Sequence, residues 1–344
     1  MSDAVAVYFV ASPLQYLAAR RIAEVHETGA RQVLVWYKPG VTPIVREADW
    51  DAAAYMPWPR WEPLPGPFGR LRRLRANIRL VAGLVGRCAT LHIHSAVFDT
   101  EAINYFLRAL PKAAGATRMR ARILPDGLIS IRRYPLSAAR RLAQCVRKSR
   151  RLIAPELDYW CFSGDRIGSD APFCDRVYVL PGLPNEYPVA KTVTLPPLVA
   201  PRAEAAASGS RRALVIGQPL VGAGLMKAAD RDAVSAEIHA WLAAEGITEI
   251  FYKGHPKDPD LELRQPDYTV VVLAEPLEVH LAQTPYDAVV GVRSSALLFA
   301  RQTSPATTRV VAFGWDRVRF KSCNEKRQMK DAFRTTGVSL HDAS

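Results

Sequence analysis

The stretch IFYKGHPK, residues 250–257, decides the fold of this chain, because an apolar, β-rich run stops there on Gly-His-Pro. A second stop of the same kind lies in the stretch VVGVRSSAL, residues 289–297, where an apolar run breaks into small and polar residues. Helical sequence follows both stops. Open α/β sheets present ligand-binding groups in this way, at the carboxyl ends of their strands. The pair therefore predicts an α/β fold in which both stops serve one ligand site.

The length bounds the number of domains. A chain of 344 residues suits two α/β domains of roughly 150 residues each. We expect the N-terminal domain at residues 1–188 and the C-terminal domain at residues 211–344. Residues 189–210 are rich in Pro, Ala and Ser and show little periodicity, which predicts an interdomain linker.

Cysteine usage and hydropathy bear on the compartment. The five cysteines are scattered and form no Cys-x-x-Cys pair, which indicates neither a disulfide framework nor a zinc site. No segment approaches the ~20 uncharged apolar residues of a membrane span. The N-terminus lacks the basic start and long apolar region of a secretory signal. We therefore expect a cytoplasmic protein.

The formal net charge of +13 implies an acidic partner. Five arginines between Arg70 and Arg79 are interspersed with apolar residues, and six basic residues between Arg140 and Arg151 flank further apolar ones. Both segments predict basic amphipathic helices, which are either solvated faces or docking surfaces for an anionic membrane. Nucleic acid is not expected as a partner, because neither segment interleaves aromatic residues that could stack on bases.

The first strand, residues 5–10, leads into a capped helix. Ser12 has the side chain of an N-cap, and Pro13 suits the first helical position. A helix that begins right after a strand can bind an anion at its N-terminus. Gln15, in the first turn, is the polar residue best placed to face a cleft.

A carboxylate follows a later strand of the first half. The strand over residues 119–124 ends on Pro125-Asp126-Gly127. Asp126 is either a general base at a strand end or part of an ordinary Pro-Asp-Gly turn, and both interpretations fit the residues.

Two further features have a structural and a functional interpretation. His92 and His94 share one face of the strand at residues 90–94, but no carboxylate or thiol cluster accompanies them in the sequence, so we expect no metal site there. Trp58 and Trp61, in the Pro-rich loop 57–67, either anchor the loop by packing or contact a bound ligand. Packing is favoured.

The second half repeats the pattern of strands that stop on small residues. The strand at residues 212–216 ends on Gly217 and Gln218, and Gly222-Ala223-Gly224 follows as either a phosphate cradle or a plain loop. Two glycines alone favour the plain loop. His255 stands at a strand end beside Lys253 and Lys257, which favours a role in binding the phosphate of a nucleotide-activated donor.

A strand over residues 268–273 precedes a helix that starts near Glu275. Glu278 lies in the first turn of this helix. It either complements the helix dipole or binds the hydroxyl groups of a ribose.

The order of these motifs resembles that of bacterial sialyltransferases of the lipooligosaccharide and capsular polysialic acid type. The resemblance runs from Tyr8 to about Phe299. Each motif is short, and their joint order at strand ends carries the resemblance: Ser12-Pro13-Leu14-Gln15, Asp126-Gly127, Gly217-Gln218-Pro219, His255-Pro256, Pro276-Leu277-Glu278 and Ser294-Ser295. The chain departs from the family pattern at Pro125, where the family motif has a first acidic residue.

The resemblance implies a GT-B architecture, two Rossmann-like domains facing a central cleft, with CMP-sialic acid held mainly by the C-terminal domain. Asp126 matches the catalytic base and His255 the group that donates to the departing CMP phosphate. Glu278 would bind the ribose, and Ser294 and Ser295 the phosphate. The full set of expected donor-binding residues is Ser12, Gln15, Gly217, Gln218, Gly254, Pro256, Glu278, Ser294 and Ser295.

The predicted function is inverting transfer of sialic acid from CMP to a cell-surface glycan or glycolipid acceptor, by a protein peripheral at the inner face of the membrane. Because the leaving group is a monophosphate, neither a metal nor a cofactor is expected. Three alternatives stay open: transfer of another CMP-activated ulosonic acid, a sugar-nucleotide epimerase or hydrolase, and an inactive accessory subunit, which the proline at position 125 keeps open.

Overall fold

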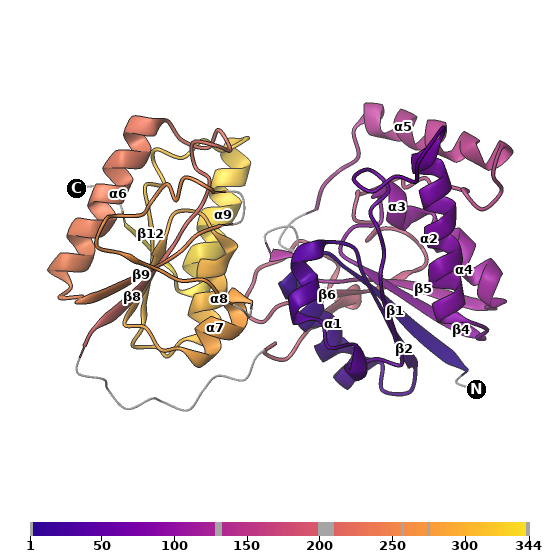
Figure 1. Cartoon of the computed structure of the whole chain (residues 1–344), viewed down its shortest axis with the longest axis horizontal. Coiled ribbons are helices and arrows are strands. Elements are labelled where there is room, and N and C mark those ends of the chain that lie inside the picture. The colour runs from indigo at the N-terminus through magenta and orange to yellow at the C-terminus, as the bar shows by residue number, and fades with distance from the viewer. Residues whose placement is uncertain (1–2, 128–132, 199–209, 256–257, 274–275, 342–344) are drawn as a thin grey trace. The chain divides into compact units, whose positions relative to one another are not determined.

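The computed structural model describes residues 3–127, 133–198, 210–255, 258–273 and 276–341. It divides into two compact units: Met1–Pro181 with Asn185–Leu198, and Gly182–Pro184 with Val199–Ser344 (Figure 1). We call them the N-terminal and the C-terminal unit and describe each by itself. In the parts of the chain listed above, no helix is both long and apolar enough to cross a bilayer.

The N-terminal unit is built on a parallel sheet of seven strands in the order β3-β2-β1-β4-β5-β6-β7. The strands are β1 (Ala4–Val10), β2 (Arg31–Trp36), β3 (Ala52–Tyr55), β4 (Thr90–Ser95), β5 (Arg118–Ile123), β6 (Cys174–Val179) and β7 (Thr192–Thr194). Helices and 3-10 turns connect them: α1 (Pro13–His26), η1 (Pro39–Ile44), η2 (Glu47–Asp49), α2 (Gly69–Val85), α3 (Glu101–Asn104), α4 (Phe106–Ala114), α5 (Ala138–Ser149), η4 (Arg150–Leu152) and η5 (Val189–Lys191). Residues 189–198, which the sequence predicted as the start of the linker, thus contain η5 and β7.

The alternation of side chains along β1 explains the layered core. Val5, Val7 and Phe9 point to one face and join a cluster with residues of α2 and α4. Ala6, Tyr8 and Val10 point to the other face and join a cluster with α1. Because both faces are covered, the strand reads as a continuous apolar run, as is typical of parallel sheets.

The C-terminal unit repeats this plan with six parallel strands in the order β10-β9-β8-β11-β12-β13. They are β8 (Arg212–Ile216), β9 (Glu249–Lys253), β10 (Thr269–Val270), β11 (Ala288–Gly291), β12 (Arg309–Phe313) and β13 (Ser339–His341). The helices are α6 (Ala228–Ala244), α7 (Leu277–Gln283), α8 (Ser295–Thr303) and α9 (Cys323–Thr336). Both sheets therefore have the 3-2-1-4-5-6 order of doubly wound nucleotide-binding folds.

One predicted strand is much shorter than expected. The sequence predicted a strand over residues 268–273, but β10 pairs with β9 only at Thr269 and Val270. It lies at the edge of the sheet, and Val272 is 92% exposed. The pairing stops because the partner strand β9 itself ends at Lys253, one residue after the last paired residue Tyr252.

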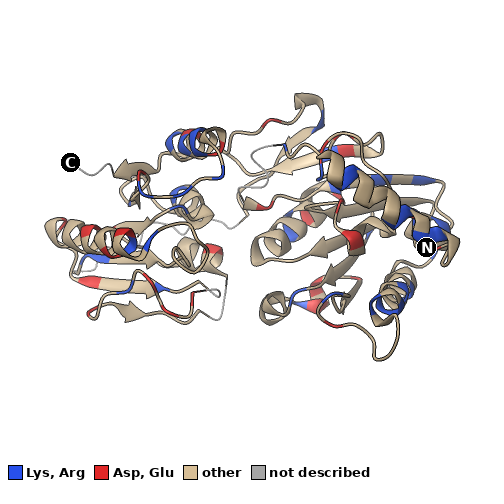
Figure 2. Ribbon diagram, turned by 90° about the horizontal axis from the view of Figure 1, so that it is seen from above, with Lys and Arg blue, Asp and Glu red and all other residues tan. Residues whose placement is uncertain are grey.

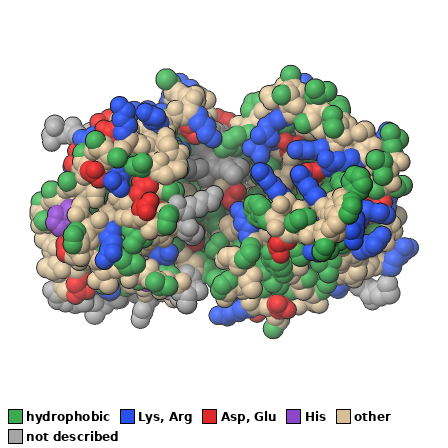
Figure 3. Space-filling view, turned by 45° about the horizontal axis from the view of Figure 1, so that its top comes forward, with side chains coloured by type: hydrophobic (Ala, Val, Ile, Leu, Met, Phe, Trp, Pro, Cys, Tyr) green, Lys and Arg blue, Asp and Glu red, His purple; other side chains and the backbone are tan. Residues whose placement is uncertain are grey.

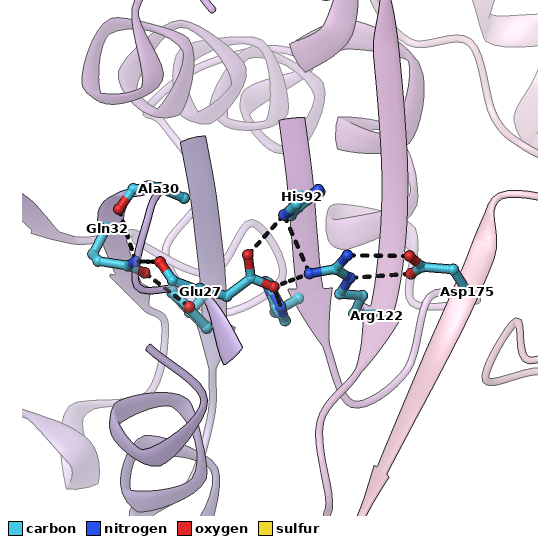
Figure 4. A network of polar contacts seen from close by, with 8 residues as sticks. Glu27, Ala30, Gln32, His92, Arg122 and Asp175 are labelled. Atoms are coloured by element: carbon cyan, nitrogen blue, oxygen red, sulfur yellow. Dashed lines mark hydrogen bonds and ion pairs between the residues drawn. The ribbon is translucent and has the colours of Figure 1, made fainter. Parts of the chain in front are cut away.

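A buried network of charges fixes the end of α1 to the N-terminal sheet (Figure 4). Arg122 on β5 pairs with Glu27, the C-cap residue of α1, and contacts Asp175 through Nε and Nη2 at 3.1 Å each. His92 Nδ1 lies 2.8 Å from the Glu27 carboxylate. Glu27 and Arg122 are 4% and 5% exposed, so each needs the other to offset the cost of burying a charge.

The same network explains the pair of histidines on β4. The guanidinium of Arg122 lies 3.2 Å from His92 Nδ1, so a cation already occupies the space beside this ring. His94 is fully buried, stacks on Tyr8, and has its pKa lowered to about 3 by burial. Within the described residues no group of three His, Cys, Asp or Glu side chains has the geometry of a metal site.

Candidate active site

Three neighbouring strands of the C-terminal sheet deliver the predicted donor-binding residues to one edge. β9, β8 and β11 are adjacent and parallel, so their carboxyl ends lie at the same edge of the sheet. His255 follows β9, Gln218 follows β8, and Ser294 follows β11. The β8–β11 pair is where the strand order reverses, the position at which open α/β sheets bind ligands.

Gln218 joins two of these loops directly. Its Oε1 accepts a hydrogen bond of 2.8 Å from the backbone N–H of Arg293, which immediately precedes Ser294. The next residue back, Val292, is also held, because its carbonyl accepts a hydrogen bond of 2.9 Å from Trp315 Nε1. The start of α8 is therefore positioned by residues of the loops that follow β8 and β12.

Ser294 is the N-cap of α8. Its backbone is extended (φ −73°, ψ 134°), and its Oγ accepts a hydrogen bond of 3.2 Å from the N–H of Ala296. Ser295 is the first helical residue, and both serines are partly exposed. A helix N-terminus with two hydroxyl groups concentrates hydrogen-bond donors and positive potential, which suits a phosphate.

Position 217 needs a glycine because the loops after β8 and β9 pack closely there. A Cβ at this position would lie 2.3 Å from the hydroxyl oxygen of Tyr252 and 3.2 Å from the carbonyl oxygen of Lys253. Its N–H donates to that same carbonyl at 2.9 Å, which ties the end of β8 to the end of β9. Glycine here lets the two loops approach closely.

His255 is exposed at the end of β9. The preceding Gly254 packs against Leu261, because a Cβ added to the glycine would lie 2.8 Å from Leu261 Cδ2. The carbonyl of Gly254 accepts a hydrogen bond of 2.9 Å from Lys253 Nζ. Burial lowers the pKa of Lys253. Pro256, the next predicted donor-binding residue, lies outside the described residues.

Glu278 lies in the first turn of α7 and is partly exposed. Burial raises the pKa of its carboxyl group, opposed by a hydrogen bond from the backbone of Glu278 itself. α7 contacts α8, so this carboxylate and the paired serines stand on helices that pack together.

The glycines of the Gly222-Ala223-Gly224 loop have their amides engaged within the protein. Glu262, a residue that the sequence did not single out, accepts hydrogen bonds from the N–H groups of Val221 at 2.7 Å and Gly222 at 3.0 Å. The N–H groups of Ala223 and Gly224 bond to Pro219 and Val221. A buried carboxylate thus occupies the place that a phosphate would take in a cradle, which supports the plain-loop interpretation.

The chain contains three Asp-x-Asp runs, a pattern with which metal-dependent transferases hold a diphosphate, and they bear on the expectation that no metal takes part. In the first, at residues 49–51, Asp51 accepts a hydrogen bond of 2.7 Å from the N–H of Gln32. In the second, at residues 230–232, Asp232 pairs with Arg231 at 2.6 Å. In the third, at residues 258–260, Asp258 is buried, accepts from the Tyr252 hydroxyl at 3.1 Å and accepts from the backbone N–H of Glu262. One aspartate of each run is therefore committed to a protein partner.

In the N-terminal unit the structure brings Asp126 and Gln15 together. Gln15 is 3% exposed, and its Oε1 accepts a hydrogen bond of 2.7 Å from the N–H of Ala11 at the end of β1. Its side chain also hydrogen-bonds to Asp126. Ser12 caps α1 by accepting from the Gln15 N–H at 3.3 Å. Gln15 follows β1 and Asp126 follows β5, so this hydrogen bond joins segments from the two strands that flank β4 in the sheet.

The environment of Asp126 suits a base. Burial raises the pKa of its carboxyl group, while the hydrogen bond from Gln15 and the positive charge of Lys38 oppose that rise. The following Gly127 has φ +51°, the left-handed conformation that favours glycine, so the chain turns directly after the carboxylate. A partly buried carboxylate of raised pKa is a stronger proton acceptor than a solvated one.

Tyr37 and Lys38, which the sequence did not single out, follow β2 and lie close enough to Asp126 to interact with its charge. Negative charge on Asp126 adds to burial in raising the pKa of Tyr37. Their place directly after a parallel strand was the signal that could have found them. Trp58 stacks on Tyr37 with ring centroids 4.5 Å apart, whereas Trp61 is 60% exposed. Packing thus explains Trp58 but not Trp61.

Comparison with known proteins identifies one family. Residues 186–312 match the family model of alpha-2,8-polysialyltransferase (POLYST), a region that includes the loops after β8, β9 and β11. No curated protein sequence matches the chain.

Several solved structures match the chain. The crystal structure of the alpha/beta-galactoside alpha-2,3-sialyltransferase from Photobacterium phosphoreum matches with a TM-score of 0.58 and 12% identity over 99% of both chains. The calicheamicin glycosyltransferase CalG4 matches with a TM-score of 0.49 and 13% identity, covering 99% of this chain and 85% of that one. The UDP-GlcNAc 2-epimerase from Methanocaldococcus jannaschii matches with a TM-score of 0.48 and 7% identity, covering 96% and 92%.

The two parallel-sheet units have the GT-B fold that the resemblance implied. The family match covers most of the C-terminal unit, and the fold match covers nearly the whole chain. The family match over residues 186–312 and the shared fold together support a glycosyltransferase of the bacterial sialyltransferase type.

Proposed function

We propose that this enzyme transfers sialic acid from CMP-sialic acid to a cell-surface glycan or glycolipid acceptor, with inversion and without a metal, at the inner face of the membrane. The observation that carries the proposal is the bond from Arg293 N–H to Gln218 Oε1. It sets the serine-bearing start of α8 beside the loop after β8 at the point where the strand order reverses. A nucleotide monophosphate is the ligand that this combination of helix N-terminus and strand-end loops fits best.

In the proposed reaction the N-terminal unit supplies the base. Asp126 accepts the proton of the acceptor hydroxyl, and the resulting oxygen attacks the anomeric carbon of the sialic acid from the face opposite CMP. The hydrogen bond from Gln15 and the positive charge of Lys38 oppose the effect of burial and so favour the ionised form of Asp126. The single carboxylate suffices for this step, so the proline at position 125 does not prevent it.

The C-terminal unit supplies the groups that stabilise the leaving nucleotide. As the bond between the anomeric carbon and the phosphate oxygen breaks, that oxygen gains negative charge. The His255 imidazolium donates a proton or hydrogen bond to it, and the Ser294 and Ser295 hydroxyls donate to the same phosphate. Glu278 accepts hydrogen bonds from the ribose hydroxyls. These groups provide the charge relief for which metal-dependent enzymes use a cation.

The test is a coupled measurement of CMP release and glycoside formation. The full chain is incubated with CMP-sialic acid and either lactose or an alpha-2,8-linked sialic acid oligomer, the acceptors suggested by the names of the matched structure and family. We expect one CMP released for each new glycoside, unchanged by EDTA. CMP release without a glycoside would instead identify a hydrolase, and loss of turnover with EDTA would refute the metal-independent mechanism. A second donor carrying another CMP-linked ulosonic acid tests the alternative substrate in the same assay.

A further inference from the structure

Helix α5 has its apolar residues on the outside. Its one buried side chain is the polar Gln144, 1% exposed, while Leu142 and Val146 are 68% and 60% exposed. The exposed apolar surface continues in η4 and the next residue, where Leu152 and Ile153 are 83% and 86% exposed. A surface helix ordinarily turns such residues toward the core. We call Leu142, Val146, Leu152 and Ile153 the apolar face of α5.

Polar contacts, rather than apolar packing, hold α5 in place. Gln144 Nε2 donates to Asp99 at 2.8 Å, and Gln144 Oε1 accepts from the N–H of Phe162 at 2.9 Å. Arg147 Nη1 contacts the Tyr159 hydroxyl at 3.2 Å. The helix is therefore fixed without the apolar face, which leaves its four side chains available to a partner.

The other basic helix, α2, differs in this respect. Its apolar residues Leu74, Ile78, Val81 and Val85 are between 0% and 7% exposed and belong to the core of the unit. Of the two segments that the sequence described alike, α5 with η4 presents the larger exposed apolar surface, because α2 exposes only Leu80, at 39%, and its N-cap Phe68, at 78%, among its large apolar residues. The structure thus separates a helix whose apolar side chains pack into the core from a helix whose apolar side chains stay exposed among the described residues.

The segment of α5 and η4 carries charge of one sign, although Arg140, Arg150 and Arg151 pair with Asp99, Glu101 and Asp158 of neighbouring elements. Residues 138–153 contain six basic residues and no acidic one: Arg140, Arg141, Arg147, Lys148, Arg150 and Arg151. α5 lies at the top of Figure 1, and Figure 2 looks down on that side, with the Lys and Arg positions in blue. Figure 3, which brings the same side forward, shows basic and hydrophobic side chains gathered on this part of the N-terminal unit.

We propose that α5 and η4 dock on an anionic membrane surface, with the apolar face inserted at the boundary between headgroups and acyl chains. Basic side chains beside inserted apolar ones are the arrangement by which interfacial helices bind anionic lipid. A second copy of this chain fits less well, because the basic residues of one segment would then face the same basic residues of the other. The importance of docking for activity rests on the proposed function, in which the acceptor is a membrane glycolipid, but the docking itself does not.

The test is co-sedimentation of the full chain with vesicles of phosphatidylglycerol and phosphatidylcholine, and with phosphatidylcholine alone. We expect binding to the anionic vesicles that weakens as salt rises. The variant Leu152→Ser/Ile153→Ser should bind roughly tenfold or more weakly, since two apolar side chains no longer leave water. The control Val189→Ser removes an apolar side chain that is 90% exposed elsewhere on the same unit and should bind like the wild type.

A charge series separates the two basic helices. Arg141→Gln/Arg151→Gln, beside the apolar face, should weaken binding by roughly fivefold for each residue. Arg72→Gln/Arg79→Gln, on α2, should change it much less. Equal effects of the two pairs would show that total charge decides binding and would overturn the assignment to α5.

Two further outcomes are decisive. Failure of the wild type to bind anionic vesicles at any salt concentration overturns the proposal. A second outcome also overturns it: sedimentation velocity shows a dimer that Leu152→Ser/Ile153→Ser abolishes, while vesicle binding by this variant is unchanged. The apolar face of α5 would then join two copies of the chain. Transfer to a soluble acceptor should be the same in this variant and the wild type, so failure of docking and failure of the catalytic proposal give different results.

Discussion

The side-chain oxygen of Gln218 accepts a hydrogen bond of 2.8 Å from the backbone N–H of Arg293, and this bond joins the loop after β8 to the start of α8. Because Arg293 directly precedes the N-cap Ser294, the bond fixes where the serine hydroxyls and the first helical N–H groups point. Gln218 is thus a positioning residue for the proposed phosphate site.

Replacing Gln218 tests this relationship. Gln218→Leu leaves the Arg293 N–H unpaired and frees the start of α8, so we expect CMP to bind about tenfold more weakly, as loss of one buried hydrogen bond predicts. Gln218→Glu keeps an acceptor oxygen and should retain most of the affinity. Isothermal titration with CMP measures both, and equal affinities for the Leu variant and the wild type would remove the positioning role.

The proposed base is tested by Asp126→Asn, which keeps the shape of the side chain and removes its ability to accept a proton. Turnover should fall by ~100-fold or more, while CMP affinity and the melting temperature change little. Asp51→Asn, in the loop before β3 of the same unit, is the matched control and should keep wild-type turnover. Wild-type turnover in Asp126→Asn would exclude this residue as the base.

The pH dependence of the rate follows from the charges around Asp126. Only the ionised carboxylate accepts a proton, so kcat/KM should fall as the pH drops through the Asp126 pKa. Burial raises that pKa, and the positive charge of Lys38 lowers it. Lys38→Met should therefore raise the pKa further and move the acid limb of the profile to higher pH.

The control for this profile is Lys112→Met, an exposed lysine on α4, which should leave the acid limb in place. An acid limb that moves to lower pH in Lys38→Met would contradict the assignment, because removing a cation cannot stabilise the ionised carboxylate.

The buried network in Figure 4 predicts a large effect on stability far from the proposed chemistry. Glu27→Ala removes the carboxylate that Arg122 and His92 contact and should lower the free energy of unfolding by about 3–5 kcal/mol. Glu24→Ala, on the exposed side of the same helix, should cost less than about 1 kcal/mol. Chemical denaturation measures both, and similar values for the two would show that the buried pair contributes no more than a surface pair.

Trp58 and Trp61 should separate packing from substrate contact. Trp58→Ala removes a ring stacked on Tyr37 and should lower the melting temperature. Trp61 is 60% exposed, so Trp61→Ala should leave the melting temperature nearly unchanged and, if the ring contacts the acceptor, raise the acceptor KM with little effect on the donor KM. An unchanged acceptor KM in Trp61→Ala would exclude the contact.

Much of the fold could be predicted because its signals are local. The apolar runs at residues 5–10 and 212–216 became β1 and β8, and the Ser12-Pro13 pair became the cap and first residue of α1. Alternation along a strand and capping at a helix start depend on neighbours within a few residues, so the sequence expresses them directly. Glu278 and the Ser294–Ser295 pair were likewise placed on helices that begin where expected.

The sequence by itself therefore determined the two-unit α/β plan and the strand ends at which polar residues gather. Only the tertiary structure decided what those residues touch. The bonds from Gln218 to Arg293, from Glu262 to the amides of Val221 and Gly222, and from Gln15 to Asp126 join segments brought together by strand order, and no local pattern encodes them. The outward apolar face of α5 is of the same kind, because a helical period fixes which residues share a face but not whether that face meets the core or water.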